Sequence, residues 1–379
     1  MFDYKHISFK PQWELSPFTI HKLGQCDALI RSFQKHPILP SIRKHFYKLS
    51  LIKNVRATTA IEGNTLTEKD IIIVRNNIGS VSEKSSYQEQ EIRNMLEAYT
   101  GIRSDIVVKK IIDEIAPDFI KDLNRRVGEG IKDHFDADPG KFRSGRVHVG
   151  DYSGPDSSKV EDYVSNLCSW LKTGQFVSFP LPEDSIAESL IKAIVAHVYI
   201  VWIHPFDDGN GRAARLLEFY ILLKDGMPDF CSHILTSHYN DTRPTYYDLL
   251  KKSSEDGDLT NFLDYAITGF LEGLNQIDDQ ICSEFWNVSW QAYAMRQLIE
   301  DNSSAEEKKR LLSIIKSIDC KKLYTPEGIL KISPEIKNQY TSEMQELNLN
   351  DLKKLFNMGL LVQISPVLYK LNRFEVIKD

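Results

Sequence analysis

The sequence has few cysteines and no close pair of them. Its five cysteines are odd in number, lie far apart and include no CxxC pair: Cys26, Cys168, Cys231, Cys282 and Cys320. A disulfide framework needs an even set of cysteines and a zinc ribbon needs CxxC pairs, so we expect neither. Unpaired thiols are typical of a reducing compartment.

Long apolar segments are also missing. The N-terminal residues MFDYKHISFKPQW contain no apolar core of a secretory signal. The longest apolar stretch, residues 191–203, includes Lys192 and His197 and is shorter than the ~20 residues that a membrane-spanning helix needs. We therefore expect a cytoplasmic protein that does not associate with a membrane.

No excess of basic charge is present. Lysine and arginine number 47, and aspartate and glutamate number 53, which gives a formal net charge of −6. A basic footprint for nucleic acid over the whole chain is therefore excluded. A chain of 379 residues with 42% hydrophobic residues can bury a large core, which excludes intrinsic disorder.

What the sequence does contain is helical periodicity. Between residues 185 and 203 the apolar residues recur at helical intervals, and the segment is too long for an ordinary strand. Pro205 ends this helix, and Gly226 and Pro228 follow the next one. We predict a mainly α fold with helices at residues 40–62, 85–101, 105–134, 158–172, 185–203, 211–224, 244–254, 259–300, 305–317, 325–331 and 348–358.

Two segments depart from this helical pattern. Residues Lys141–Pro155 contain RVHVGDYSGP, which predicts a short β-hairpin with a Gly-Pro turn. Near the C-terminus, LLVQISPVLYKLNR predicts two short strands around Ser365-Pro366. Because helices followed by a β-ribbon resemble a winged helix, we expect a small α+β module at residues 301–379.

Two roles for this C-terminal module stay open. It has 13 basic and 11 acidic residues, so its charge gives DNA binding only weak support. A module for packing or dimerisation agrees with the same composition at least as well.

Residues 204–215, HPFDDGNGRAAR, join the end of one apolar helix to the start of the next. Gly209 and Gly211 leave room for a ligand beside the backbone, and the N-terminus of the following helix offers unpaired N–H groups. Arg212 and Arg215 are three residues apart, so they share a helical face and can hold anionic oxygens. We therefore expect a phosphate site in this segment.

Two other side chains in the segment suggest catalysis. Asp208 lies beside the anion site, where a carboxylate would repel phosphate unless Mg²⁺ bridged the two. His204, at the helix end before Pro205, is placed to take a proton from a hydroxyl nucleophile. The arrangement indicates nucleotidyl transfer.

Two other interpretations of this segment compete. Residues 209–214 also match the dinucleotide-binding pattern GxGxxA, with Asp229 near the position of a ribose-binding acid. That pattern must follow a strand, whereas residues 185–203 have helical periodicity. A purely structural loop would not need a histidine, two aspartates, two glycines and two arginines together.

The segment resembles the signature of the Fic family (filamentation induced by cAMP), HPFx[D/E]GNGRxxR, at every specified position. The resemblance covers residues 40–275 and implies a helical core that uses MgATP to transfer AMP to a hydroxyl of a target protein. It implies that His204 is the general base and that Asp208 is the Mg²⁺ ligand. It also implies ATP binding by His204, Asp208, Gly209, Asn210, Gly211, Arg212 and Arg215.

A second motif lies at the end of the helix expected at residues 40–62. Glu62 precedes Gly63, so its carboxylate lies at the negative end of the helix dipole and should be compensated by a cation. Thr58 and Glu62-Gly63 match the family's inhibitory pattern [S/T]xxxE[G/N]. The resemblance implies that Glu62 pairs with Arg215 and blocks productive ATP binding. A solvated glutamate at a helix end is the alternative.

Two further segments resemble nucleotide contacts of the family. Residues 142–155 resemble a flap that pairs with a target peptide through its main chain. Its nucleotide-side positions are Val149, Gly150, Asp151 and Tyr152. The segment SHYNDTRPTYYDLL resembles the part that contacts adenine and contains Tyr239, Arg243, Tyr246 and Tyr247. Either Tyr246 or Tyr247 is explained equally well as a core aromatic residue.

These patterns predict a protein adenylyltransferase restrained by Glu62. Its regions are 1–100 with the inhibitory motif, 101–300 with the catalytic core, and 301–379 with the C-terminal module. Its expected partners are ATP, Mg²⁺, a target protein with a Ser, Thr or Tyr hydroxyl and, by the resemblance, a second copy in a homodimer. The alternatives are removal of AMP, transfer of another phosphate-containing group, and a nucleotide-sensing regulator that acts through the C-terminal module.

Overall fold

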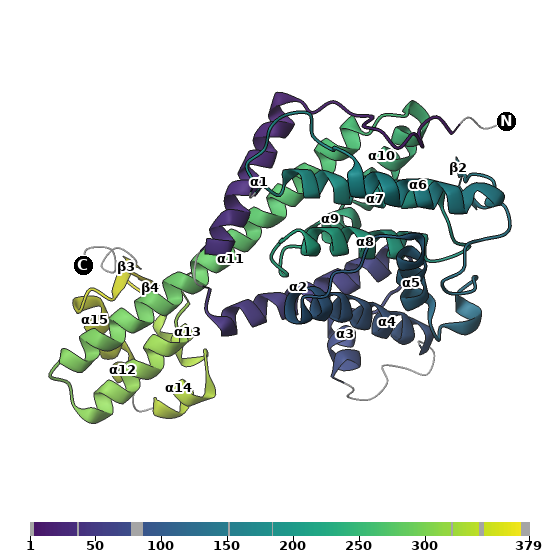
Figure 1. Cartoon of the computed structure of the whole chain (residues 1–379). Helices are drawn as coiled ribbons and strands as arrows, with labels where there is room; N and C mark the ends of the chain where they lie inside the picture. The colour runs from purple at the N-terminus through teal and green to yellow at the C-terminus, as the bar shows by residue number, and fades with distance from the viewer. Residues whose placement is uncertain are drawn as a thin grey trace. The chain divides into compact units, whose positions relative to one another are not determined.

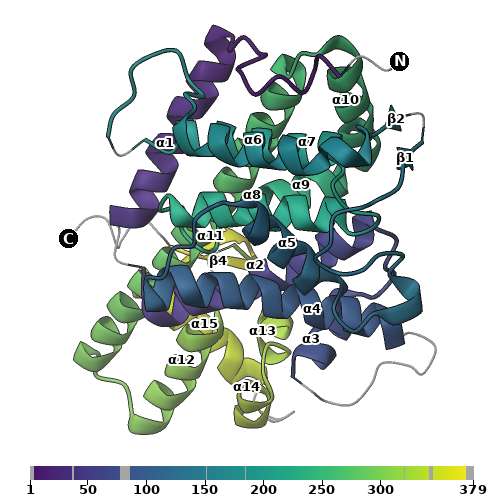
Figure 2. The ribbon, with the colours of Figure 1, turned by 45° about the vertical axis from the view of Figure 1, so that its right-hand side comes forward.

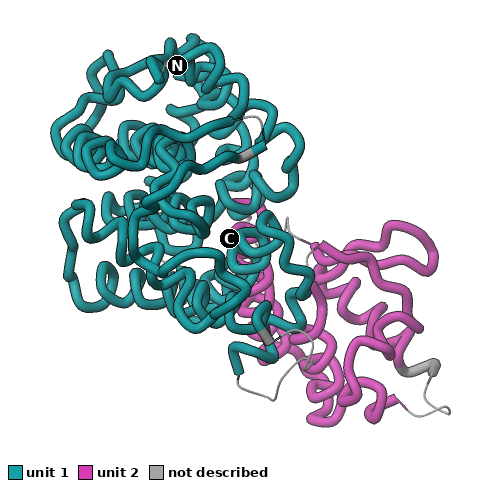
Figure 3. Tube along the Cα trace, turned by 90° about the vertical axis from the view of Figure 1, so that its right-hand side faces the viewer, with its two compact units in different colours: residues 1–277 teal, residues 278–379 magenta. Residues whose placement is uncertain are grey.

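The structure is a computed structural model, and it describes residues 4–35, 38–76, 86–150, 152–183, 185–319, 321–340 and 345–372. The described part is mainly α-helical, as predicted, and its strands form two antiparallel sheets of two strands each. The chain forms two compact units, Met1–Ile277 and Asp278–Asp379 (Figure 3). The regions 1–100, 101–300 and 301–379 are defined by motifs rather than by compactness and stay a prediction.

The helices are distributed over both units, and α11 contains the boundary between them (Figure 1). Up to that boundary the helices are α1 (Pro17–Lys35), α2 (Pro40–Ile61), α3 (Glu68–Arg75), α4 (Ser86–Arg103), α5 (Pro117–Gly128), α6 (Val160–Thr173), α7 (Ala187–Ile203), α8 (Asn210–Lys224), α9 (Ile234–Asp241), α10 (Arg243–Asp256) and α11 (Thr260–Glu300). The helices that follow are α12 (Ala305–Ser317), α13 (Pro326–Leu330), α14 (Pro334–Gln339) and α15 (Gln345–Asn357).

Helices α7 and α8 form the centre of the first unit. Most side chains of both helices are buried, so neither helix has a solvent face and both need neighbours on every side. α6 packs on α7, and both α4 and α5 pack on α8 (Figure 2). Because α7 ends at Ile203 and α8 begins at Asn210, the loop between them is anchored at both ends by buried helices.

The prediction of one continuous helix over residues 105–134 is wrong. α4 is followed by a π-helical turn at Ser104–Lys109, which ends at Lys110 with a left-handed backbone (φ 59°). A new helix, α5, begins at Pro117, and Ala116 before it is extended (φ −129°, ψ 166°). Proline lacks an N–H and disfavours a helical residue before it, so Pro117 starts a helix instead of lying inside one.

The sequence pattern does not predict α1, α3, α9 or α14. A local signal for α3 exists, since Thr67 caps it and forms a capping box with Asp70. α1 also carries a signal that the list of expected helices leaves out, since its buried apolar residues Leu23, Cys26, Ile30 and Phe33 recur at intervals of three and four.

The β-hairpin predicted within Lys141–Pro155 is present, but the Gly-Pro turn is wrong, because the turn contains Gly150 and the predicted Gly154-Pro155 follows the second strand. β1 (His148–Val149) pairs with β2 (Tyr152–Ser153) in antiparallel register, at the edge of the helical body (Figure 2). Gly150 in the turn has φ 57°, a left-handed conformation that favours glycine. Asp151 and the side chain of Val149 lie outside the described residues.

The second unit combines short helices with a second hairpin. Its core gathers large side chains such as Trp290, Leu311 and Leu352. β3 (Leu361–Ser365) pairs with β4 (Leu368–Leu371), and Tyr324 forms an isolated bridge with Tyr369. Helices followed by a β-hairpin are the predicted order, and the assignment to a winged helix stays a prediction.

Within the described ranges, no helix combines the length and the apolar composition that a bilayer crossing requires. Four of the cysteines lie in these ranges as free thiols: Cys26, Cys168, Cys231 and Cys282.

Candidate active site

The candidate site is built on the loop between α7 and α8. His204 follows the last turn of α7 with a left-handed backbone (φ 48°, ψ 61°). Gly209, before α8, is also left-handed (φ 79°, ψ 9°). Asn210 closes the loop, because its side chain accepts a hydrogen bond from Phe206 N at 2.9 Å and donates one to Phe206 O at 2.8 Å. The side chain of Asn210, a predicted ATP contact, is thus engaged within the loop.

The two glycines of the loop occupy positions where a side chain does not fit. A Cβ at Gly209 would lie 2.9 Å from Asn124 Nδ2 and 2.9 Å from Phe135 Cζ. A Cβ at Gly211 would lie 2.6 Å from Glu62 Oε1. The N–H groups in the first turn of α8 have no intrahelical acceptor and lie at the positive end of the helix dipole. The predicted phosphate cradle therefore has the backbone donors that an anion needs.

His204 is held through one ring nitrogen. Nδ1 lies 3.3 Å from Val201 O, and because a carbonyl only accepts hydrogen bonds, this contact assigns the proton to Nδ1 and makes Nε2 the basic nitrogen. Burial lowers the pKa of His204 to about 4, and the cation of Arg143 acts in the same direction. The imidazole is therefore neutral at physiological pH, which is the form that accepts a proton.

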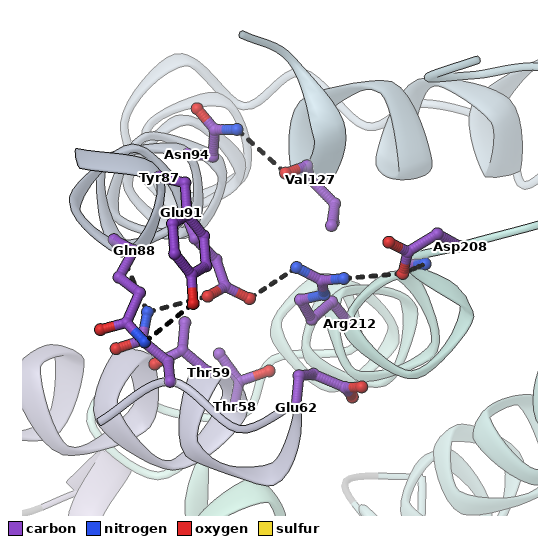
Figure 4. Close-up of polar contacts among 12 residues, drawn as sticks. Thr58, Thr59, Glu62, Tyr87, Gln88, Glu91, Asn94, Val127, Asp208 and Arg212 are labelled. Carbon is purple, nitrogen blue, oxygen red and sulfur yellow. Dashed lines mark hydrogen bonds and ion pairs between the residues drawn. The ribbon is translucent and has the colours of Figure 1, made fainter. Parts of the chain in front are cut away.

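Arg212 lies between two carboxylates (Figure 4). Its Nη1 donates to Glu91 Oε1 at 2.5 Å, and its Nη2 donates to Asp208 Oδ1 at 2.9 Å. Asn64, just after the inhibitory motif, donates to Glu91 Oε2 at 2.8 Å. Burial raises the pKa of Glu91, although the ion pair with Arg212 opposes that shift. Nothing in the local sequence singles out Glu91, because a glutamate on an amphipathic helix usually faces solvent.

Asp208, the predicted Mg²⁺ ligand, lines a cavity of about 190 Å³ together with Glu62 and Arg212. Its side chain is 30% exposed, and its backbone carbonyl accepts a hydrogen bond from Asn124 at 2.9 Å. No group of three or more His, Cys, Asp or Glu side chains in the described part of the chain could hold a metal. Mg²⁺ usually takes one or two carboxylates and completes its shell with water and phosphate oxygens, so Asp208 fits such an ion.

Arg215 is bound by two residues of the predicted inhibitory motif, Thr58 on α2 and Glu62 at its end. Its Nη2 donates to Glu62 Oε1 at 2.6 Å, and its Nε donates to Thr58 Oγ1 at 2.8 Å. Burial acts to raise the pKa of Glu62, but Arg215 and Arg212 outweigh it, so the pKa lies below its usual value. The pairing that the sequence resemblance implies is therefore present, with Glu62 ionised.

The end of α2, which carries Glu62, is held by α10. Arg243 Nη1 donates to Ala60 O at 3.0 Å, and Arg243 Nη2 donates to Ile61 O. Tyr247 OH donates to the same Ile61 carbonyl at 3.5 Å. Arg243 thus places a cation at the negative end of the α2 dipole, as the dipole argument requires.

The other two tyrosines of the predicted adenine segment are buried. Tyr239 OH donates to Glu218 Oε1 at 2.9 Å, Tyr246 OH lies 2.9 Å from His197 Nε2, and the two tyrosine rings stack at 4.8 Å. Burial raises the pKa of Glu218 to about 8. Their burial favours a core role for Tyr239 and Tyr246, whereas Tyr247 is 46% exposed. Adenine contact by these tyrosines stays a prediction.

The flap packs against the end of α7. Tyr152 OH donates to Trp202 O at 2.7 Å, so the Tyr152 side chain reaches the helix end. Tyr4 OH donates to Gly154 O at 2.7 Å and ties the N-terminal segment to the flap. A Cβ at Gly154 would lie 3.6 Å from His204 Cβ. The start and end of the flap therefore lie close to His204, the predicted general base.

Comparison with known proteins places this site in a family. The model of the Fic/DOC family matches residues 114–222. The curated "Protein adenylyltransferase Fic" of Nematostella vectensis is 28% identical over 223 residues, which are 59% of this chain and 48% of the relative. The "Protein adenylyltransferase Fic" of Aedes aegypti is 31% identical over 222 residues, which are 58% of this chain and 40% of the relative. The chain thus spans less than half the length of these relatives.

Solved structures share the fold. A Fic family protein from Desulfovibrio desulfuricans covers 96% of this chain and 98% of its own, with a TM-score of 0.58 at 17% identity. Fic-1 from Caenorhabditis elegans covers 70% of this chain and 73% of its own, with a TM-score of 0.56 at 23% identity. The signature loop, the family match and these folds agree, and the chain therefore carries a Fic domain, at residues 114–222.

Proposed function

We propose that this protein transfers AMP from ATP to a Ser, Thr or Tyr hydroxyl of a target protein and that Glu62 restrains the transfer. The observation that carries the proposal is the 2.6 Å ion pair between Glu62 and Arg215, since Arg215 is one of the two arginines of the Fic signature. The names of the curated relatives support adenylyl transfer as the reaction type.

In the proposed reaction His204 accepts the proton of the target hydroxyl at Nε2, while Nδ1 stays bound to Val201 O. The hydroxyl oxygen forms a bond to the α-phosphorus of ATP, the bond from that phosphorus to the bridging oxygen breaks, and pyrophosphate leaves. The first-turn N–H groups of α8 and the guanidinium of Arg212 lie where they can stabilise negative charge on the phosphate oxygens.

Asp208 is the residue that would hold Mg²⁺. Its partly exposed carboxylate lines the cavity beside Arg212, and a single carboxylate agrees with an ion that takes its other ligands from phosphate and water. When bound, Mg²⁺ supplies charge neutralisation at the phosphates.

The proposed restraint is a competition for Arg215. The guanidinium is 1% exposed, and two of its nitrogens bind Thr58 and Glu62, so a phosphate oxygen would have to displace an ionised carboxylate. Glu62 Oε1 also lies against Gly211, where even one added carbon would approach it to 2.6 Å. The carboxylate therefore adds both negative charge and bulk beside the phosphate cradle.

The proposal is tested by AMP transfer from α-labelled ATP with Mg²⁺. Wild type, Glu62→Gly and His204→Ala are compared, each alone and with cell lysate as the source of acceptor proteins. We expect label on protein that rises in Glu62→Gly and disappears in His204→Ala. Silence of all three proteins while ATP still binds would reject adenylyl transfer and favour AMP removal or nucleotide sensing.

Removal of AMP is a second candidate because Glu62 lines the same cavity as Asp208, and its side chain is 31% exposed. A carboxylate at that position is placed to activate a water molecule for hydrolysis. Release of labelled AMP from protein already modified by Glu62→Gly measures this activity. Under this second function wild type releases AMP and Glu62→Gly does not.

Location and assembly are further parts of the proposal. The free thiols agree with a reducing compartment and so with the cytoplasm. A homodimer is tested by light scattering of the full chain during gel filtration. DNA contact through the second unit is tested by a gel shift of the full chain in moderate salt.

A further inference from the structure

Arg143 is a buried cation at the start of the flap, with 3% of its surface exposed. Its three guanidinium nitrogens donate to main-chain carbonyls: Nε to His204 O at 2.7 Å, Nη1 to Gly145 O at 2.7 Å and Nη2 to Pro155 O at 2.5 Å. Its backbone N–H donates to Pro205 O at 2.9 Å. A buried guanidinium needs such partners, and the planar fork of arginine can reach several of them at once.

These acceptors belong to two different parts of the site. Gly145 and Pro155 flank the β1–β2 hairpin on either side, so Arg143 closes the base of the flap. His204 and Pro205 belong to the signature loop. One side chain and its own backbone therefore join the flap to the segment that carries the predicted general base.

The backbone of His204 needs this support. Its left-handed conformation (φ 48°) is uncommon for a residue with a side chain, and a following proline favours an extended conformation instead. Arg143 binds the carbonyl oxygens of both residues of the His204-Pro205 step. Such a conformation persists only where the surrounding contacts fix it, and these two hydrogen bonds act on the peptide groups concerned.

The flap lies close to His204, the predicted general base. A Cβ at Gly154 would lie 2.8 Å from Val147 Cγ1, 3.2 Å from Arg143 Nη2 and 3.6 Å from His204 Cβ. The backbone of the flap at Gly154 thus lies close to the guanidinium and to Cβ of His204, with no room for a side chain at this position. A shift of Arg143 would move both the flap and His204.

We propose that Arg143 is a positioning residue that fixes His204 and the flap in one relative placement. The inference rests on the proposed adenylyl transfer. In that reaction the flap aligns the target peptide and His204 must lie within hydrogen-bond reach of its hydroxyl. The separation between flap and imidazole then determines the rate of the chemical step, and Arg143 sets that separation without touching the reactants.

The test uses Glu62→Gly as the parent, so that the proposed restraint does not mask the result. Arg143→Gln keeps a donor but loses the charge and the fork, and we expect its kcat to fall about 100-fold, the loss that a small misplacement of a reacting group causes. The KM for ATP should stay near the parental value, because the expected phosphate contacts lie at residues 208–215. Lys141→Gln is the matched control, since the Lys141 side chain forms an exposed ion pair with Asp138.

A second measurement does not depend on turnover. Histidine labelled with ¹⁵N reports which ring nitrogen of His204 carries the proton, and His204→Ala identifies the signal. We expect the proton on Nδ1 in the parent and a mixture of tautomers in Arg143→Gln, because a relaxed backbone releases the ring from Val201 O. A role confined to the flap would leave this signal unchanged.

Arg143→Lys covers the case in which the glutamine variant does not fold, since it keeps the buried charge. One ammonium cannot reproduce the fork, so we expect a kcat between those of the parent and of Arg143→Gln, again with the parental KM for ATP. A parental kcat together with an unchanged His204 signal in either folded variant would overturn the proposal. If the Glu62→Gly parent transfers no AMP, the proposed function fails, while the histidine spectra still decide the role of Arg143.

Discussion

Glu62 and Arg215 are 153 residues apart in the chain, and Glu62 Oε1 accepts a hydrogen bond from Arg215 Nη2 at 2.6 Å. The arginine is buried and the glutamate is partly exposed, so the pair has one fixed partner and one that can leave. A ligand that needs Arg215 must therefore displace Glu62 rather than move the arginine. The expected effects of changing this site follow from that asymmetry.

Glu62→Gly should raise AMP transfer by about 10- to 100-fold, because a hydrogen bond between charged groups contributes about 1.5–3 kcal/mol to the restrained state. Initial rates with α-labelled ATP measure the effect. Glu129→Gly is a matched control, since Glu129 is the residue at the C-terminal end of α5 and its side chain forms an ion pair with the exposed Arg125. An unchanged rate in Glu62→Gly would contradict the proposed restraint.

Thr58→Val should leave the rate of transfer within about 2-fold of wild type, because Arg215 stays in place when a ligand displaces Glu62 and its hydrogen bond to Thr58 is present in both states. Thr59→Val is the control, since the Thr59 hydroxyl donates to Val55 O within α2. Initial rates of AMP transfer with α-labelled ATP measure the effect of both substitutions. A rise as large as that of Glu62→Gly would contradict this expectation and show that the Thr58 hydroxyl also restrains the reaction.

Glu91→Gln should lower the free energy of unfolding by about 1–3 kcal/mol, because Arg212 would lose a charged partner in a buried site. Urea denaturation measures the change. Glu97→Gln on the exposed face of the same helix is the control and should be neutral. Equal stability of Glu91→Gln and wild type would show that Asp208 alone satisfies Arg212.

The pH profile of AMP transfer should lack the fall near pH 6.5 that a free histidine gives. Burial lowers the pKa of His204 to about 4, so its basic form persists until the pH approaches that value. For the Glu62→Gly variant we expect kcat/KM to stay level from pH 8 to below 6 and to fall at lower pH. An acid limb centred at 6.5 or above would contradict this assignment.

The lowered pKa of His204 also makes the free energy of unfolding depend on pH. An unfolded chain binds a proton at His204 near pH 6.5, whereas the folded chain binds it only near pH 4. This group therefore leaves stability unchanged above pH 6.5 and lowers it as the pH falls from 6.5 toward 4. Urea denaturation of wild type and His204→Ala at pH 7 and pH 5 should show a smaller loss for the variant.

The parts of the fold that follow from local sequence could be predicted. α7 and α8 have strong apolar periodicity and clear stop signals, and both lie close to the expected ranges. The π-helical turn and the break before Pro117 could not be seen by periodicity, because apolar residues continue through a segment whose backbone changes. Proline at the start of a helix was the local signal that outweighed the pattern.

The candidate site also has some contacts that the sequence could predict and others that it could not. The Glu62–Arg215 contact could be expected because both residues match motifs of the Fic family, and the resemblance implies that these two positions pair. The Glu91–Arg212 contact could not, because it joins an ordinary amphipathic helix to the signature over 121 residues. The burial of Tyr239 and Tyr246 depends on how α9 and α10 pack, and a single sequence does not encode that in any local pattern.

The contacts of Glu62 and Glu91 also show how much of the chain a fragment must include to keep them. The family match covers residues 114–222 and includes both signature arginines, but the glutamates that pair with them come from α2 and α4, outside the match. A fragment cut at the edge of the match would keep two nearly buried guanidinium groups and lose the glutamates that balance their charge. The smallest fragment that keeps both of these ion pairs is therefore longer than the matched segment, and it begins no later than α2.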